Sequence, residues 1–293
     1  MRPFKLLDPR SLDEACQMLD RYGEDVKLMS GGTAILILLR QRVFSKPYFI
    51  NLKAVPGLDG IRDEPGTGLR IGALATLRAV ETSPIVRQRA PLITETFRLV
   101  ANVRVRNSGT LGGNLSHGDY RLDPPAPLLV LGAKAVAVSS RGRNTYELKE
   151  FFRGLFETAL QPDEILTEVV VPDAPPKAGT AYFKYTSLSE TDWPCLGVAA
   201  LVTPSDGGGT CGELRVAVTS VAERPMLLEH LGPLARGKRL TERLLEELGD
   251  AAAERVDPIA DARGSEWYKK EMVRVFVRRA VREAARRAGL AAG

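Results

Sequence analysis

The chain has 293 residues, of which 44% are hydrophobic and 26% are charged, and its formal net charge is +5. A chain of this length buries a large core and predicts two domains rather than one. The positive charge comes with neither a recognised nucleic-acid motif nor an aromatic-rich basic patch, so we expect no nucleic-acid partner.

The cysteines and the hydropathy of the chain narrow its class further. Cys16, Cys195 and Cys211 are scattered without C-x-x-C spacing, which argues against an iron–sulfur cluster held by this chain and against a disulfide framework. No run of about eighteen apolar residues is present, and the segment Met1–Lys5 leads into structure without the apolar stretch of a signal peptide. We therefore expect a cytoplasmic protein without a transmembrane segment.

The first fifty residues predict a small α/β unit. Ser11 and Glu14 form a capping box that begins a helix. Residues 26–29 are predicted to be a strand, residues 34–39 carry the apolar stripe of a short helix, and residues 48–52 are predicted to be a second strand. This unit forms a small lobe over residues 1–57.

A turn-rich passage, residues 56–68, separates this lobe from a larger one. The larger lobe, residues 58–175, is predicted to contain strands at 69–73, 134–139 and 165–171, and helices after Thr76, from Pro91 to Val100, and at 124–131. The proline cluster at residues 172–177 predicts the boundary between a domain of residues 1–175 and a C-terminal domain of residues 176–293.

The C-terminal domain is predicted to be a sheet covered by helices. Its predicted elements are strands at 181–185, 196–203 and 213–221, and helices at 241–248 and 265–288. Gly207–Gly209 predicts a hairpin loop. The last helix is strongly basic, which fits either a solvated face or docking against an acidic partner. The whole chain is therefore predicted to be an α+β protein with mixed sheets.

Two glycine-rich segments carry the functional signal. The first glycine segment, residues 27–33, and the second glycine segment, residues 107–115, lie about eighty residues apart. Each contains a hydroxyl residue, Thr33 or Thr110, and each is expected to follow a strand-like stretch. Since glycine lets the main chain approach an anion closely, the pair predicts two surfaces that clamp the two phosphates of one dinucleotide. Neither segment has the spacing of a Rossmann fingerprint or a P-loop.

These segments also carry a family resemblance that runs nearly end to end. The chain resembles the FAD-binding medium subunits of the molybdenum hydroxylases, the family of xanthine dehydrogenases and aerobic carbon monoxide dehydrogenases. The matching motifs are Ser30–Thr33, Ile71–Leu77, Val103–Asp119, Glu164–Val169, Gly197–Ala200 and Ser265–Lys270. The long motif at 103–119 is the most specific of them.

The resemblance implies a two-lobed FAD-binding domain of the vanillyl-alcohol oxidase-like (PCMH) type, followed by a smaller α+β C-terminal domain. FAD would lie between the lobes, bound without a covalent bond. The residues implied to hold its diphosphate are Ser30, Gly31, Gly32, Thr33, Thr110, Gly112, Gly113 and Asn114.

Further roles around the cofactor follow from the same resemblance. Leu28 and Ile35 would flank it, and Leu166 would pack near the adenine. Asp119 would be a structural or hydrogen-bonding partner near the flavin, and Asp123 would bind ribose or adenine-side hydroxyls. Lys184 would lie close to the isoalloxazine and stabilise its reduced anionic form; the alternative is an exposed strand lysine.

Three other positions have open interpretations. His117 could attach flavin covalently, but the family does not use this bond. The chain has Ser187 where the family commonly has a basic residue. Trp193 stands where a smaller residue is frequent, and it would either shield the flavin ring or fill the core.

The implied function is electron transfer within a larger enzyme. The partners would be a large molybdenum-cofactor subunit and a small subunit with two [2Fe–2S] clusters, assembled as a dimer of heterotrimers. The molybdopterin and the clusters would belong to these partners, and we expect no catalytic or metal-binding residue in this chain. Two alternatives remain: a self-sufficient reductase like UDP-N-acetylenolpyruvoylglucosamine reductase, and a scaffold subunit without flavin.

Overall fold

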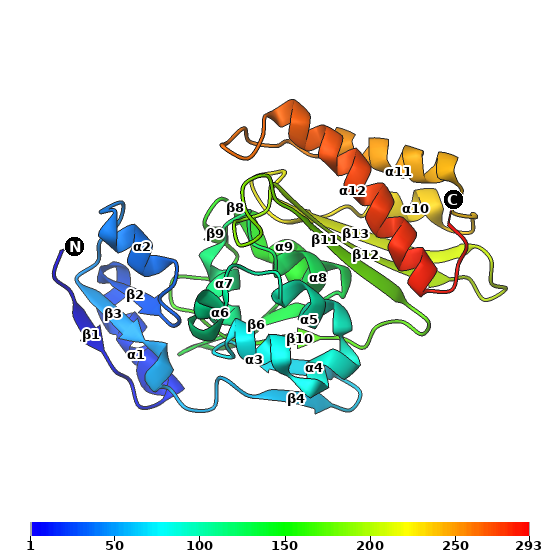
Figure 1. The fold of residues 1–293 in the computed structure, drawn as a ribbon. Coiled ribbons are helices and arrows are strands. Elements are labelled where there is room, and N and C mark those ends of the chain that lie inside the picture. The colour runs from blue at the N-terminus through cyan, green and yellow to red at the C-terminus, as the bar shows by residue number, and fades with distance from the viewer. Residues whose placement is uncertain (1, 293) are drawn as a thin grey trace.

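The computed structural model describes residues 2–292, which form a small N-terminal lobe, a larger middle lobe and a C-terminal sheet with helices along one face (Figure 1). The amino-terminal lobe is blue in this view, and the carboxyl-terminal helix is red at the opposite side of the molecule. The predicted α+β class and the two-part architecture are confirmed.

The small lobe is a three-stranded parallel sheet with two helices. Its strands, in spatial order, are β1 (Lys5–Leu7), β3 (Tyr48–Asn51) and β2 (Val26–Met29). The helix α1 (Leu12–Tyr22) begins at Ser11, whose hydroxyl accepts from the amide of Glu14 at 3.1 Å, as the capping box predicted. The short helix α2 (Ile35–Arg40) follows the first glycine segment.

The larger lobe has an antiparallel sheet covered by helices. The sheet order is β4 (Ile61–Glu64), β5 (Gly68–Gly72), β10 (Ile165–Val171), β6 (Lys134–Ser139) and β7 (Gly142–Glu147). The helices are α3 (Leu77–Thr82), α4 (Pro84–Arg89), α5 (Pro91–Phe97), α6 (Val103–Ser108), α7 (Leu111–His117), α8 (Pro125–Val130) and α9 (Leu148–Phe151). A small hairpin, β8 (Phe152–Gly154) with β9 (Glu157–Thr158), completes the lobe.

The C-terminal sheet is antiparallel and lies between two layers of helices. Its order is β11 (Gly179–Tyr185), β12 (Leu196–Pro204), β13 (Cys211–Thr219) and β14 (Met226–Leu227). The helices α10 (Leu231–Ala235), α11 (Glu242–Arg255) and α12 (Glu266–Arg287) cover its outer face (Figure 1). Ala199, Leu201 and Ala217 on the inner face join the core of the larger lobe, so the C-terminal sheet is packed on both faces.

Several predicted elements need correction. The stretch before the second glycine segment, expected to be strand-like, belongs to the helix α6, which Asn102 caps through the amides of Arg104 and Val105. The turn-rich passage 56–68 contains the strand β4, and β7 and α4 were not predicted. The sheets are also not mixed, since each is either wholly parallel or wholly antiparallel.

Most basic side chains of the helix α12 form ion pairs within the chain. Its Arg274, Arg278 and Arg282 pair with Asp250, Glu246 and Glu242 of the neighbouring helix α11. These acidic partners from α11 compensate part of the positive charge that was expected to face either solvent or an acidic partner.

Candidate functional site

The two glycine segments meet in the fold. The hydroxyls of Ser30 and Thr110 lie 2.9 Å apart, within hydrogen-bonding distance. A Cβ on Gly31 would overlap the main-chain oxygen of Ser108 and lie 2.8 Å from the Cα of Gly109, so the backbones approach more closely than any side chain permits. The expected juxtaposition of two glycine-rich backbones therefore exists.

The first glycine segment is an open turn between β2 and α2. Gly32 has a φ of +75°, a conformation that favours glycine. Residues 28–35, which include Leu28, Thr33 and Ile35, are all partly exposed, so this turn lies at the surface of the lobe. The Oγ1 of Thr33 lies beside Gly109 of the second segment, 3.3 Å from where a Cβ of that glycine would be.

The second glycine segment runs from the end of α6 into the beginning of α7. Thr110 is the N-cap of α7, and its hydroxyl accepts from the amide of Gly113 at 3.1 Å. Gly113 is exposed, and a Cβ there would lie 2.6 Å from the hydroxyl oxygen of Ser30. The hydroxyls of Ser30 and Thr110 and the surface of Gly113 thus form one polar patch.

A neighbouring stretch of main chain positions the second segment. The amide of Leu77 donates to Gly109, and the amides of Leu111 and Gly112 donate to Ala75 and Ala73, at 2.8–2.9 Å. A Cβ on Gly112 would lie 2.5 Å from the Cβ of Ala73. Gly112 is therefore required for packing on this stretch, a role that the sequence analysis did not assign. Ala73 belongs to the motif Ile71–Leu77, so this motif was the part of the sequence that indicated the packing partner of Gly112.

Asn114 offers an open acceptor. Its Oδ1 is buried, and none of the described residues donates to it. Buried polar atoms in proteins are nearly always hydrogen-bonded, so an unpaired acceptor beside the two glycine segments fits a hydroxyl group of a bound dinucleotide. This orphaned atom and the close backbone approach both suit FAD.

Asp119 is fully engaged inside the chain. It is 1% exposed, and the Arg121 guanidinium donates to its two carboxylate oxygens at 2.9 and 2.6 Å. Hydrogen bonding to Asp119 raises the pKa of Arg121. His117 packs against Phe156 with ring centroids 4.9 Å apart, and burial lowers the pKa of its imidazole.

Asp123 and Lys184 lie together, whereas the resemblance placed them at different parts of the cofactor. The Nζ of Lys184 donates to Asp123 at 3.1 Å, and the hydroxyl of Tyr182 donates to the other carboxylate oxygen at 2.6 Å. The Asp123 and Lys184 side chains are each 4% exposed, so Lys184 is not an exposed strand lysine. Burial raises the pKa of Asp123, and the charge of Lys184 opposes this shift.

Leu166 lies in the same core cluster as Leu111 and Leu115 of α7. Its side chain is 4% exposed and belongs to the core of the larger lobe. The strand β5 pairs with β10 only from Glu168 onward, whereas Ile165 belongs to the small-lobe core.

Trp193 does not fill the core, since it is 43% exposed. The guanidinium carbon of Arg121 lies 4.8 Å from the centroid of the indole, and that of Arg263 lies 5.5 Å from it. Arg263 also donates to Asp192 at 2.8 Å, and its main-chain oxygen accepts from Ser187 at 2.8 Å. The sequence analysis did not find these arginine partners.

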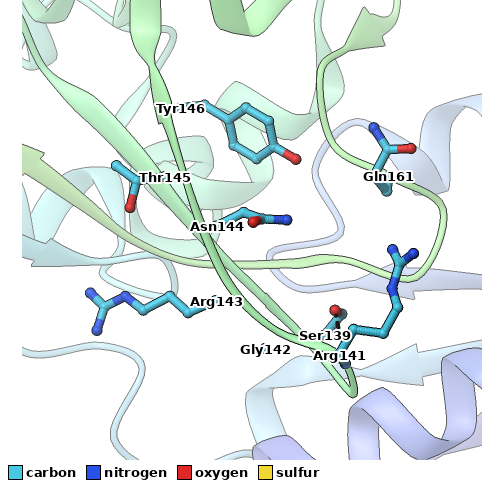
Figure 2. A pocket seen from close by; sticks show the side chains of 8 residues that line it. All are labelled: Ser139, Arg141, Gly142, Arg143, Asn144, Thr145, Tyr146 and Gln161. Atoms are coloured by element: carbon cyan, nitrogen blue, oxygen red, sulfur yellow. Dashed lines mark hydrogen bonds between the residues drawn. The ribbon is translucent and has the colours of Figure 1, made fainter.

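A separate polar pocket of about 550 Å³ lies along β7 and contains none of the predicted site residues. Its lining residues are Ser139, Arg141, Gly142, Arg143, Asn144, Thr145, Tyr146 and Gln161. Figure 2 shows Asn144 and Tyr146 directed toward Gln161, with Arg143 and Thr145 on the other side of the strand. Tyr146 donates to the buried Glu164 at 2.6 Å, so much of the pocket wall is already hydrogen-bonded.

Comparisons with known proteins agree with this geometry. Residues 2–174 match the family described as the FAD binding domain in molybdopterin dehydrogenase, and residues 181–284 match the CO dehydrogenase flavoprotein C-terminal domain. The chain is 35% identical to the carbon monoxide dehydrogenase medium chain of Hydrogenophaga pseudoflava, with 96% of each chain covered. It is 31% identical to the nicotine 6-hydroxylase medium subunit of Paenarthrobacter nicotinovorans, with 97% of this chain and 98% of that subunit covered.

The solved structures give the same result. A structure of carbon monoxide dehydrogenase from Hydrogenophaga pseudoflava that lacks the Mo-pyranopterin moiety superimposes with a TM-score of 0.94, at 34% identity and with 98% of each chain covered. Both parts of the chain match the medium-chain pattern, which favours this family over the self-sufficient reductase. The chain therefore belongs to the FAD-binding medium subunits of the molybdenum hydroxylases.

Proposed function

We propose that FAD binds across the two glycine segments, with its diphosphate held where Ser30 meets Thr110. The single observation that carries this proposal is the 2.9 Å approach of these hydroxyls from segments eighty residues apart in the sequence. The diphosphate ligands would be Ser30, Gly31, Gly32, Thr33, Thr110, Gly113 and Asn114, with Leu28 and Ile35 beside the cofactor. Gly112 would support them by packing on Ala73.

In this family, FAD supplies electron transfer between the iron–sulfur clusters of a partner subunit and an external acceptor. The residues of this chain would bind and orient the cofactor. Main-chain amides, hydroxyls and the side-chain NH2 group of Asn114 would bind anionic oxygens of the diphosphate, whereas the open Oδ1 of Asn114 would accept a hydrogen from a hydroxyl group of FAD. The ion pair with Arg121 would hold the Asp119 carboxylate in place after the second glycine segment.

The chain acts with a large molybdenum-cofactor subunit and a small iron–sulfur subunit, and we propose a dimer of heterotrimers in the cytoplasm. None of the described helices is long and apolar enough to cross a membrane.

We also propose that the FAD-binding domain covers residues 1–175, as lobes of residues 1–57 and 58–175, and that the C-terminal domain covers residues 176–293. The antiparallel sheets support this division, because no strand of one pairs with a strand of the other.

The test is the flavin content of the protein purified from its native host together with its partners. We expect about one FAD per copy of this chain and its release on acid precipitation, because the binding residues are backbone amides and hydroxyls. A preparation that contains no flavin and takes up no added FAD would contradict the proposal. Flavin retained by the denatured chain would contradict only the non-covalent attachment.

A further inference from the structure

The short helix α2 presents apolar side chains to its outside. Its residues Ile35–Arg40 have the sequence ILILLR, and Leu39 is the only buried one among them. Leu36 is 41% exposed, Ile37 is 48% exposed, and Val43 just beyond the helix is 70% exposed. A helix that is apolar all round is normally buried in a protein. The side chains of Leu36, Ile37 and Val43, which we call the α2 surface, therefore fit contact with another molecule.

The loop after α2 returns to the helix and extends this surface. The amide of Val43 donates to the carbonyl of Leu38 at 3.1 Å, and the amide of Arg42 donates to that of Leu39 at 3.2 Å. Arg42 has a φ of +59°, which is rare for a residue with a side chain. These hydrogen bonds hold Val43 at the end of the helix, beside the exposed side chains of α2.

The surroundings of the α2 surface are positively charged. Residues 26–50 contain four lysine or arginine residues and neither Asp nor Glu. Arg40 and Arg42 are exposed, and no ion pair within the described residues 2–292 includes either of them. The arginines of α12, in contrast, pair with acids of α11. An apolar centre with an unpaired basic rim complements a partner whose contact face is apolar and edged with acidic residues.

The α2 surface also lies next to the proposed FAD site. The helix begins at Ile35, directly after the first glycine segment, and a Cβ on Gly32 would lie 3.2 Å from the side chain of Leu36. A protein that covers Leu36 therefore comes close to the bound cofactor. Electron tunnelling becomes slow as the distance grows, so the subunit that delivers electrons to FAD must lie close to it. In this family that subunit is the small iron–sulfur subunit rather than the large molybdenum subunit.

We propose that the α2 surface docks the small iron–sulfur subunit, with Leu36, Ile37 and Val43 at the centre of the contact and Arg40 and Arg42 at its rim. The inference rests on the proposed binding of FAD at the glycine segments. The contact face of the partner would be apolar and edged with acidic residues. A [2Fe–2S] cluster held by thiolates adds negative charge to that subunit.

Cross-linking identifies the subunit that lies on the α2 surface. Val43 would be replaced by the photo-cross-linking amino acid p-benzoylphenylalanine in the complete complex, which is then irradiated. We expect a cross-link to the small subunit. A cross-link to the large subunit or to a second copy of this chain overturns the proposal, and so does the absence of any cross-link.

Ile85 is the matched control position. It is 39% exposed and lies on α4, another six-residue helix with arginines in its last turn. The same amino acid at this position should give no cross-link to the small subunit. A cross-link of equal yield from position 85 would show that the reaction is not specific to the α2 surface, and the proposal fails.

Ile37→Glu tests the energetics of the contact. A carboxylate at the centre of the surface is desolvated on docking and repels acidic residues of the partner. We expect the affinity of the chain for the complex of its large and small partners to fall at least about tenfold, while its Kd for FAD stays at the wild-type value. Unchanged affinity for the partners overturns the proposal, and loss of FAD binding would show that the helix serves the cofactor instead.

Ile85→Glu should bind the partners and FAD like the wild type, and an equal loss of partner affinity in this variant refutes the assigned surface. Arg40→Gln/Arg42→Gln tests the charge of the rim, and it should slow association and weaken its dependence on salt. A salt dependence identical to that of the wild type contradicts the acidic contact face. The cross-link requires no bound flavin, so failure of the wild-type chain to bind FAD would refute the proposed function separately.

Discussion

At the scale of single residues, the site depends on positions that only glycine, which has no side chain, can occupy. Gly31 and Gly112 are needed because the chain approaches them closely, whereas Gly32 is needed for its backbone conformation. These are different physical requirements, and only the second can be tested without forcing two packed segments apart. A Cβ on Gly32 would contact only the flexible side chain of Leu36, at 3.2 Å.

The substitution Gly32→Ala should therefore weaken FAD binding in a protein that still folds. An alanine at a φ of +75° costs about 1–2 kcal/mol, and relief of this strain would turn the amides of the first glycine segment away from the ligand. We expect at least a tenfold rise in the Kd for FAD, measured by flavin titration.

Gly66→Ala is the control for this prediction, since Gly66 has a φ of +80° and no atom near its Cβ position. It should lose similar stability in denaturant unfolding and keep its FAD affinity. Equal FAD affinities for the two variants would show that the conformation of Gly32 has no part in binding.

At the scale of elements, β10 is the central strand that joins the two edges of the larger sheet. Its Glu168 accepts from Arg70 of β5 at 2.9 Å, also pairs with Arg143 of β7, and lies 3.4 Å from Arg62 of β4. One carboxylate thus connects strands on both sides of β10. The hydrogen bond from Arg70 is the main cause that lowers the pKa of Glu168 in the folded protein.

The lowered pKa of Glu168 determines whether the protein gains or loses stability as the pH falls. Stability from Glu168 is present above its unfolded pKa of about 4.5 and is lost as the pH falls through the lower folded value. Glu168→Gln should reduce the free energy of unfolding by about 1.5–3 kcal/mol at pH 7, and by less as the pH drops below about 4.5. Urea unfolding at a series of pH values measures both effects.

Glu246→Gln serves for comparison, because Glu246 pairs with Arg278 at 3.3 Å on the surface and is 58% exposed. Its loss should stay below about 1 kcal/mol at every pH. A Glu168→Gln variant with a pH profile parallel to that of the wild type would refute the assigned role.

At the scale of the whole molecule, the C-terminal sheet and the larger lobe share one core. Ala199, Leu201 and Ala217 pack with residues of the larger lobe, and Lys184 and Arg215 reach across to main-chain oxygens of that lobe. The two domains therefore meet through apolar and polar contacts together. The described residues also contain no group of three or more metal-ligating side chains that could hold a metal ion.

Because the relatives are medium subunits of multi-subunit enzymes, the single chain without its partners should oxidise no organic substrate at an ordinary enzymatic rate of about 1–1000 per second. Only slow reactions with NADH or oxygen are expected, since these belong to the flavin itself. Steady-state assays of the isolated chain beside the complete complex test this expectation. Substrate turnover by the isolated chain at a rate in that range would overturn the subunit assignment.

The sequence alone determined the class, the family and most elements of this protein. The strands 26–29, 134–139 and 165–171 were predicted at their observed bounds, and the capping box placed the start of α1. These features depend on neighbours close in the chain, such as apolar alternation and helix caps. The glycine segments were also visible in the sequence, because glycine and hydroxyl residues stand together there.

Only the tertiary structure decided which distant residues become partners. The pairing of Asp123 with Lys184 joins residues 61 positions apart, and ion pairs of α12 use acids from α11. Local pattern also failed at α6, where the Asn102 cap outweighed the apolar residues that suggested a strand. Ion pairs between residues distant in the sequence depend on how the chain folds back on itself. The sequence alone does not show which charged side chains become partners.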